Sequence, residues 1–465
     1  MSQESGNANG SGGAGGAGPR GARGGKPTAR LVAGKVVART LRDGAFASAA
    51  LSSELDRAVQ LAPRDRALAT ELVYGALRYR PFVDDEMARA SSRGKTNLDP
   101  ETHAHLLVAG YQLFGLDRVP PFAAVNEAVT LVRGVRGDRV AAFANAVLRR
   151  LTERAASMDP AARLEARLVS TPEWLVSALT KSLGKEGTRD FLVASSEAPP
   201  ACLGVRDESL RDAAMAKART VAPDATVTPG RVSKLAFTVA GGGSPSALAD
   251  AIGDGTFVQE EGSQVVALSL GAKPGERILD ACAGRGNKTA LLALAAGTCD
   301  AADLHPKKLE RLAIELLARG AKVGATFAVD WSLGKGDAAD VAPYDAILVD
   351  APCSGTGTLR RRPDMWLRRT PEGLTELAAL QASILAEVSG LVRPGGRLVY
   401  AVCSVLREES ESVVDAFLAS HLDFEEAPFA GEAARAIFGE QTRGRLLPGE
   451  HGTDGYFVAS VRRRG

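Results

Sequence analysis

The second half of the chain alternates short apolar runs with longer helical stretches, and each run ends in an aspartate or a cysteine. From about residue 261 these runs read RILDACAGRG, TCDAADLHP, ATFAVDWS, YDAILVDAPC and RLVYAVCS. Strand, turn and helix repeated in this way indicate a parallel sheet that helices cover on both faces. In such sheets a ligand binds in the crevice at the carboxyl ends of the strands. We therefore expect an α/β domain with its site at the ends of these runs, and a late strand in DGYFVASVRR that pairs antiparallel near the edge.

The first half of the chain predicts a different architecture. Apolar residues between about 29 and 160 recur at helical spacing, as in Leu68, Leu72 and Leu77, and strand-like alternation is missing. This spacing indicates an all-α domain. The segment between the two halves mixes helix-like with short strand-like pieces, which is typical of a small α+β connector. The predicted division is a disordered Gly/Ala/Arg tail at 1–28, a helical domain at 29–160, a connector at 161–260 and an α/β domain at 261–465.

Composition sets weaker limits on function. The 465 residues carry a formal net charge of only +2, so any nucleic-acid footprint must be local. The five cysteines form no CxxC pair and suit a reducing compartment. No leader segment and no apolar run near 18 residues is present, which predicts a soluble cytoplasmic protein without a membrane partner. His103 and His105 are too isolated to form a metal site, and we expect no metal.

A glycine turn and a series of aspartates suggest a nucleoside ligand. The turn in LDACAGRGNKTA follows a strand that ends at Asp280, and it presents backbone N–H groups and a helix N-terminus to a ligand. Its spacing is neither that of a Walker loop nor that of GxGxxG. Asp303, Asp330 and Asp350 end the next three strands. One such aspartate is usually a turn or helix cap, but four in succession favour an adenosine-type ligand.

Two scarce thiols end the fourth and fifth strands, Cys353 in DAPCSGTG and Cys403 in YAVCSVLR. A nicotinamide enzyme has no need of thiols there, whereas a cytosine C5 methyltransferase does. A thiolate that adds to carbon 6 of cytosine makes carbon 5 nucleophilic enough to take a methyl group. A base then removes the C5 proton, and a second thiol can help the adduct break down. The pair therefore points to RNA cytosine C5 methylation.

These motifs resemble the Sun/Nop2-type RNA (cytosine-5) methyltransferases from about 30 to 463. The most specific stretches are DAPCSGTGTLRRRPDMWLR and YAVCSVLREESE, supported by GTFVQEEGSQ, DACAGRGNKT, LQASIL and GTDGYFVASV. LAPRDRALATELVYGALR and VNEAVTLVRG…FANAVLRRL resemble a NusB-like helical domain, an RNA- and protein-binding module. That front domain places the chain with the bacterial RsmB branch, which methylates small-subunit ribosomal RNA.

The resemblance implies a Rossmann-like S-adenosylmethionine-dependent domain and a role for each motif residue. Cys403 would be the nucleophile, Cys353 the release-assisting thiol and Asp350 a partner of the target base. Arg360 to Arg362 would contact the RNA backbone. The residues that would hold S-adenosyl-L-methionine are Cys282, Ala283, Gly284, Arg285, Gly286, Asn287, Lys288, Asp303, Asp330 and Asp350. The implied partner is RNA, in the first place 16S rRNA, and the implied state is a monomer.

Some residues depart from the family pattern or stay outside the predicted site. The family turn usually reads Ala-Ala-Pro-Gly-Gly-Lys, whereas this chain has Arg285 and Asn287 within Ala-Gly-Arg-Gly-Asn-Lys, and Val402 stands where Thr is common. These changes bear on donor affinity more than on chemistry. Glu408 and Glu409 are interpreted as the start of the next helix. Cys282 and Cys299 are interpreted mainly as small buried residues, and Cys202 lies outside the catalytic unit.

Three other functions stay open on the sequence. A DNA cytosine methyltransferase also uses a Pro-Cys at the fourth strand, although the second cysteine and the front domain argue against it. An RNA other than 16S rRNA, such as tRNA, is a second possibility. A non-catalytic RNA-binding assembly factor is a third, and it predicts a damaged donor turn or a missing thiol.

Overall fold

The computed structural model describes residues 27–91, 94, 97–253 and 255–465. The predicted disordered tail at 1–28 therefore lies outside the described residues except for its last two positions. Thr28 is one of these, and its hydroxyl caps the first helix by accepting a hydrogen bond from Leu31 N.

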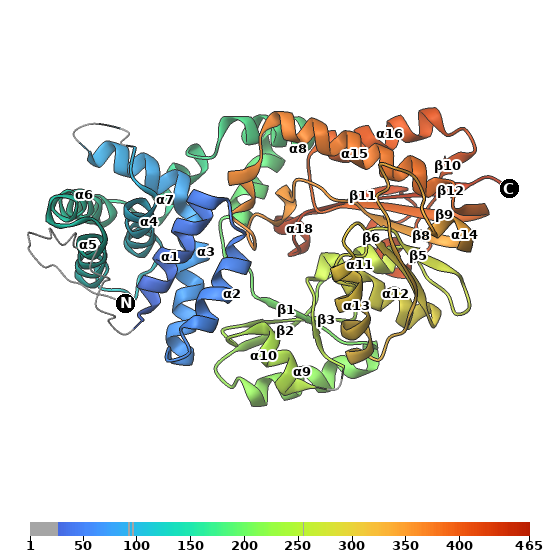
Figure 1. The fold of residues 1–465 in the computed structure, drawn as a ribbon, viewed down its shortest axis with the longest axis horizontal. Coiled ribbons are helices and arrows are strands. Elements are labelled where there is room, and N and C mark those ends of the chain that lie inside the picture. The colour runs from blue at the N-terminus through green and yellow to red at the C-terminus, as the bar shows by residue number, and fades with distance from the viewer. Residues whose placement is uncertain (1–26, 92–93, 95–96, 254) are drawn as a thin grey trace, which may run out of the picture.

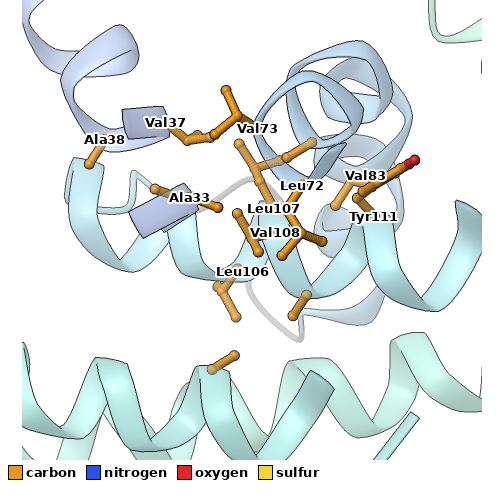
Figure 2. Packing of buried hydrophobic residues seen from close by; sticks show 14 of the residues in the cluster. Ala33, Val37, Ala38, Leu72, Val73, Val83, Leu106, Leu107, Val108 and Tyr111 are labelled. Carbon is orange, nitrogen blue, oxygen red and sulfur yellow. The ribbon is translucent and has the colours of Figure 1, made fainter. Parts of the chain in front are cut away.

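The first part of the chain is a bundle of helices. Its members are α1 (Ala29–Asp43), α2 (Ala47–Arg57), α3 (Pro63–Ala90), α4 (Pro100–Gly115), α5 (Pro121–Arg136) and α6 (Asp138–Ser157). Proline stands at the start of α3, α4 and α5, where its missing N–H leaves no intrahelical bond unmade. Figure 2 shows the bundle core, in which Val37, Leu72 and Leu107 meet from three helices with little or no exposed surface. The expected all-α domain is confirmed.

Two helices, followed by a small sheet with short helices of its own, connect the bundle to the rest of the chain. They comprise α7 (Pro160–Val169), α8 (Glu173–Ser195), β1 (Ala201–Gly204), η1 (Glu208–Leu210), α9 (Arg211–Val221), β2 (Thr226–Pro229), β3 (Ala236–Ala240), α10 (Pro245–Ile252) and β4 (Phe257–Val258). The four strands pair antiparallel in the order β2-β3-β1-β4. This mixed helix and strand content agrees with the α+β character that the sequence predicts.

The last part is a larger sheet with helices on both faces (Figure 1). Its first half contains α11 (Glu261–Ser269), β5 (Ile278–Asp280), α12 (Asn287–Ala296), β6 (Cys299–Asp303), α13 (Pro306–Ala318), β7 (Val323–Ala328), α14 (Ala338–Val341), β8 (Tyr344–Asp350), η2 (Thr356–Thr358) and η3 (Met365–Arg368). Its second half contains α15 (Pro371–Ser389), β9 (Val392–Val402), η4 (Arg407–Glu409), α16 (Glu411–Ser420), β10 (Phe424–Glu426), α17 (Glu432–Phe438), β11 (Arg443–Leu446), α18 (Pro448–His451) and β12 (Tyr456–Arg463).

The strand order positions the site. The sheet runs β10-β12-β9-β8-β5-β6-β7, with β11 paired to β12. Strands β5 to β9 are mutually parallel, and β12 pairs antiparallel with β9 close to the edge, as expected. The chain winds outward in one direction from β5 to β7 and then returns to start β8 on the other side of β5. That reversal opens a crevice at the carboxyl ends of β5 and β8.

The helical bundle docks on the segment that follows the first thiol. Arg78 of α3 donates a hydrogen bond to the carbonyl of Arg360 over 2.7 Å, and Ala47 N donates to Asp364 over 3.3 Å. The guanidinium of Arg368 lies 3.8 Å from the centre of the Phe46 ring. The helical bundle therefore docks on the loop at residues 360–368, which follows the end of β8. Among the described residues, no helix is long and apolar enough to cross a membrane.

Candidate active site

The two thiols meet at the ends of neighbouring strands. In the β8–β9 pair, Asp350 lies opposite Ala401, and each chain then turns towards the other. Cys353 and Cys403 come three and two residues further on, and their sulfur atoms lie 3.3 Å apart, within hydrogen-bonding distance. Both are partly exposed. This S–H···S hydrogen bond, together with burial, holds the pKa of Cys353 well above its ordinary range.

A close backbone approach folds the first thiol turn onto the second. Gly357 N donates to the carbonyl of Cys403 over 3.0 Å, while the Gly357 carbonyl accepts from Gly455 N over 2.8 Å. A Cβ atom at position 357 would lie 1.9 Å from the Gly455 carbonyl oxygen, so only glycine fits. Arg369 fixes the same turn by donating to the carbonyls of Cys353 and Ser354.

An ion pair spans the crevice between β5 and β8. Lys288, in the first turn of α12, places its Nζ atom 2.6 Å from a carboxylate oxygen of Asp350, and both side chains are largely buried. Burial opposes the lysine charge, but attraction to Asp350 and the hydrogen bond to it raise the pKa of Lys288. The pair keeps one fixed cation and one fixed carboxylate beside the thiols.

The glycine turn between β5 and α12 is built as expected. Ala283 N donates to the carbonyl of Ala302, and Gly284 N donates to the carboxylate of Asp303 over 3.0 Å. Gly286 caps α12 with a φ of 83°, and a Cβ there would lie 2.6 Å from Leu312 Cγ, so both its conformation and its packing require glycine. The turn thus holds the strand end and the helix N-terminus at the crevice.

The next two aspartates lie at the end of β6 and just beyond the end of β7. Asp303 ends β6, and its buried carboxylate accepts hydrogen bonds from Gly284 N, His305 N and the half-exposed Lys308. Asp330 lies two residues beyond β7 and is exposed, with one oxygen held by the backbone and side chain of Ser332. These hydrogen bonds lower the pKa of Asp330, which keeps it charged. Two carboxylates on neighbouring strand ends form an acceptor set that matches the hydroxyl and amino donors of a nucleoside.

Two residues of the predicted donor segment point elsewhere. The exposed side chain of Arg285 lines an open cleft of about 670 Å³ against α2, together with Asp56 and Arg57. Asn287 accepts a hydrogen bond from Arg319 over 2.6 Å, which ties it to the end of α13. The side-chain contacts of both residues are therefore with the scaffold or the cleft.

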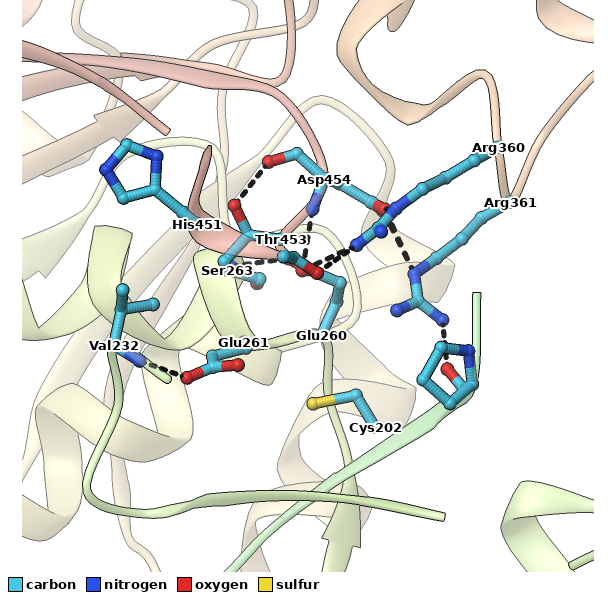
Figure 3. A network of polar contacts seen from close by, with 12 residues as sticks. Cys202, Val232, Glu260, Glu261, Ser263, Arg360, Arg361, His451, Thr453 and Asp454 are labelled. Atoms are coloured by element: carbon cyan, nitrogen blue, oxygen red, sulfur yellow. Dashed lines mark hydrogen bonds and ion pairs between the residues drawn. The ribbon is translucent and has the colours of Figure 1, made fainter. Parts of the chain in front are cut away.

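The predicted contact of Arg360 with RNA is wrong, because its guanidinium is buried. Figure 3 shows Arg360 and Arg361 converging on Asp454, with closest N–O distances of 2.6 Å and 3.1 Å. Arg361 also donates to the carbonyl of Pro200, and Asp454 N donates to Glu260. The two arginines hold the loop that follows Cys353 to the connector, which leaves Arg362 as the exposed member of the run.

The interpretation of Glu409 as a helix start is also wrong. Glu409 ends the short η4 turn before α16, is fully buried, and accepts hydrogen bonds from both thiol turns. Gln381, from the LQASIL motif on α15, donates to Glu409 and to the carbonyl of Pro352. In the sequence, the only signal for this arrangement is the presence of a polar Gln381 inside the helix and of a glutamate after the second thiol. The serines that complete the arrangement lie 5 and 55 positions from Glu409.

The other three cysteines take no part in this geometry. Burial raises the pKa of Cys202, Cys282 and Cys299, so their thiols stay protonated and unreactive. Cys282 remains part of the glycine turn between β5 and α12 through its backbone.

A doubly wound sheet with a glycine turn and strand-end carboxylates at the switch point is an architecture that methyltransferase domains share with dinucleotide-binding enzymes. Comparison with protein families agrees. The family model described as 16S rRNA methyltransferase RsmB/F matches residues 267–462, and the NusB family matches residues 27–153. The chain therefore belongs to the ribosomal RNA small subunit methyltransferase B family, with a NusB-like domain in front of a Sun/Nop2-type methyltransferase domain.

Relatives cover nearly the whole chain. A Bacillus subtilis protein named "Probable ribosomal RNA small subunit methyltransferase B" is 32% identical over 95% of this chain and 100% of its own length. The ribosomal RNA small subunit methyltransferase B of Pseudomonas syringae pv. tomato is 32% identical over 93% of this chain and 96% of its own length. The crystal structure of PH0851 superposes with a TM-score of 0.74 at 22% identity, over 94% of this chain and 99% of that one, which shows a shared fold.

Proposed function

We propose that the protein methylates carbon 5 of a cytosine in 16S rRNA, with S-adenosyl-L-methionine as methyl donor and Cys403 as a covalent nucleophile. The observation that carries this proposal is the 3.3 Å contact between the sulfurs of Cys353 and Cys403 at the donor crevice. A methyltransferase that acts on a nucleophilic nitrogen or oxygen has no need of a thiol, and still less of two in contact. Cytosine C5 is a poor nucleophile and does need one.

The residues around the crevice fit the donor. Asp303 and Asp330 would hold its ribose and adenine ends, and the turn from Cys282 to Lys288, which leads into the N-terminus of α12, would line the remainder. Lys308 is the half-exposed partner of Asp303 and can yield its place to a ribose hydroxyl. When bound, S-adenosylmethionine supplies an electrophilic methyl group next to the thiols.

The chain's own groups and a base of the solvent perform the remaining steps. The thiolate of Cys403 adds to C6 of the cytosine, and the ring electrons move to C5, which takes the methyl group. A base of the solvent then removes the C5 proton, and the electron pair of the C5–H bond forms the C5=C6 double bond. The C6–S bond breaks, and its electron pair returns to the sulfur of Cys403. Asp350, held by Lys288 at 2.6 Å, would hydrogen-bond the amide edge of the base. The thiol of Cys353 gives a proton to the departing sulfur.

The target base must leave its stack, because C6 is shielded inside a helix. The docked helical bundle and the exposed Arg362 lie beside the crevice and suit the role of RNA holders. RNA affinity should then fall with added salt in proportion to the phosphates neutralised.

Two alanine variants test the proposal. Cys403→Ala should lower methylation of a 16S rRNA transcript by about 10⁴-fold or more, because the nucleophile is lost. Cys353→Ala should form the covalent protein–RNA adduct but release it slowly, so the adduct accumulates on a denaturing gel. Tritium transfer from labelled donor to 16S rRNA, tRNA and duplex DNA measures substrate choice in the same assay.

The outcomes separate the alternatives. Full turnover by Cys403→Ala would refute the thiol assignment. Preference for duplex DNA or for tRNA would refute the 16S rRNA substrate while leaving the chemistry intact. A wild-type protein that binds RNA without methyl transfer would indicate an assembly factor.

A further inference from the structure

One buried carboxylate joins the two thiol turns. Each thiol is followed by a serine, Ser354 after Cys353 and Ser404 after Cys403. Glu409 accepts a hydrogen bond from Ser354 N over 2.7 Å, a second from the Ser354 hydroxyl, and a third from the Ser404 hydroxyl over 2.6 Å. The same side chain therefore holds the backbone of one turn and the side chains of both.

Further hydrogen bonds hold Glu409, which forms the bridge between the two thiol turns, in place. Gln381 donates to Glu409 over 3.1 Å and to the carbonyl of Pro352 over 2.9 Å, which extends the bridge to the residue before Cys353. The Tyr400 hydroxyl donates to the backbone carbonyl of Glu409 over 2.7 Å. All these side chains are buried. A buried carboxylate is very unfavourable unless it is fully hydrogen-bonded, so this one has little freedom to move.

The position of the bridge is what gives it a role in the reaction. The β8–β9 ladder pairs Asp350 with Ala401, and the residues beyond belong to turns. Beyond the strands, the links between the turns include the Cys353–Cys403 sulfur contact, the Gly357 N–H on the Cys403 carbonyl, the contacts of Ser354 and Thr356 with Ser404, and Glu409. The charge of Glu409 also helps to raise the pKa of Cys353, which keeps that thiol protonated.

We propose that Glu409 is a positioning residue that clamps the Cys353 turn onto the Cys403 turn, so that the Cys353 proton reaches the sulfur of Cys403 as the adduct breaks. The proposal rests on the proposed function and assigns Glu409 to its release step. As the C5 proton passes to a solvent base, the C6–S bond breaks with its electron pair on Cys403. The Cys353 S–H then protonates that sulfur and regains a proton from water.

The test combines two substitutions at Glu409 with the Cys353→Ala background. Glu409→Ala removes the clamp, and a displacement of the thiol turns by about 1 Å should lower turnover about 100-fold. The adduct should accumulate as it does in Cys353→Ala. Glu409→Gln keeps the shape, and its amide can accept from Ser354 N and donate to the two hydroxyls, so turnover should stay within about tenfold of wild type. Glu408→Ala, the neighbouring carboxylate outside the bridge, is the matched control.

The decisive comparison is the double variant. If Glu409 acts through Cys353, Glu409→Ala should add little to the release defect of Cys353→Ala, because both remove the same step. Donor affinity, measured by calorimetry, should stay unchanged in every variant. An additive effect, or a Glu409→Gln variant as slow as Glu409→Ala, would overturn the proposal. Absence of any adduct in wild type and in Cys353→Ala would instead refute the proposed covalent chemistry. If Glu409→Ala fails to fold, the Gln variant and its double decide.

Discussion

Asp280 is a carboxyl group buried at the end of β5, with only 1% of its surface exposed. One oxygen accepts a hydrogen bond from the Thr289 hydroxyl over 2.7 Å. Burial, helped by the nearby charge of Asp350, raises the pKa of Asp280 to about 6. The folded protein therefore holds a proton here that the unfolded chain loses near pH 4.

This proton predicts a pH-dependent stability. The contribution of Asp280 to stability is fully present below about pH 4 and is lost as the pH rises through about 6. The total loss is about 3 kcal/mol, because each pKa unit corresponds to ~1.4 kcal/mol. Asp280→Asn keeps the acceptor for Thr289 but has no proton to lose. Urea unfolding at pH 4, 5, 6 and 7 should show wild type losing stability relative to Asp280→Asn as the pH rises. A constant difference between the two proteins across this range would be incompatible with the raised pKa.

Single residues differ in how far the sequence predicted them. Cys353 and Cys403 were predictable because each ends an apolar strand, and parallel strands bring their carboxyl ends to one edge. Glu409 was not, because acids before a helix are common and the donors that bury this one come from residues up to 55 positions away. Arg360 was misjudged for the same reason, since its partner Asp454 lies 94 positions further on.

At the scale of the element, Gly286 is the position in the turn before α12 where both conformation and packing require glycine. Gly286 and Gly297 both have positive φ, 83° and 94°, at opposite ends of α12. A Cβ on Gly297 would meet open space, whereas one on Gly286 would collide with Leu312 and Leu316 of α13.

The pair separates conformational strain from steric conflict. Gly297→Ala should lower the free energy of unfolding by about 1–2 kcal/mol through left-handed strain alone. Gly286→Ala should lose a further ~1–3 kcal/mol from overpacking, and it should weaken donor binding because the turn shifts. Chemical denaturation and calorimetry of donor binding measure both effects. Equal losses in the two variants would mean that α13 does not constrain the turn.

The sheet itself was predictable for a physical reason. Near-continuous apolar runs indicate strands that are buried on both faces, and β8 and β9 are such strands. The docking of α2 and α3 on residues 360–368 had no signal in the sequence, because it depends on single side chains such as Phe46 and Asp364 meeting across separate domains.

For the whole molecule, the buried ion network of Figure 3 joins the loop that follows Cys353, the segment before β12 and the residue before β1. Arg360→Met should destabilise the protein by about 3 kcal/mol, because Asp454 keeps its burial but loses its closest cation. Arg362→Met, two positions along and exposed, should cost less than about 1 kcal/mol. Denaturation by urea compares them. Similar costs for both would show that the network does not hold the parts together.

The central claim is that Cys403 bonds to C6 of a cytosine, and trapping that bond tests it most directly. A 16S rRNA transcript made with 5-fluorocytosine has no C5 proton to lose, so the adduct cannot be released after methyl transfer. After nuclease and trypsin digestion, mass spectrometry can distinguish peptide 398–407, which contains Cys403, from peptide 336–360, which contains Cys353. We expect a methylated fluorocytidine nucleotide on peptide 398–407. Its presence on peptide 336–360, or its absence from both peptides while normal RNA is methylated, would contradict the account.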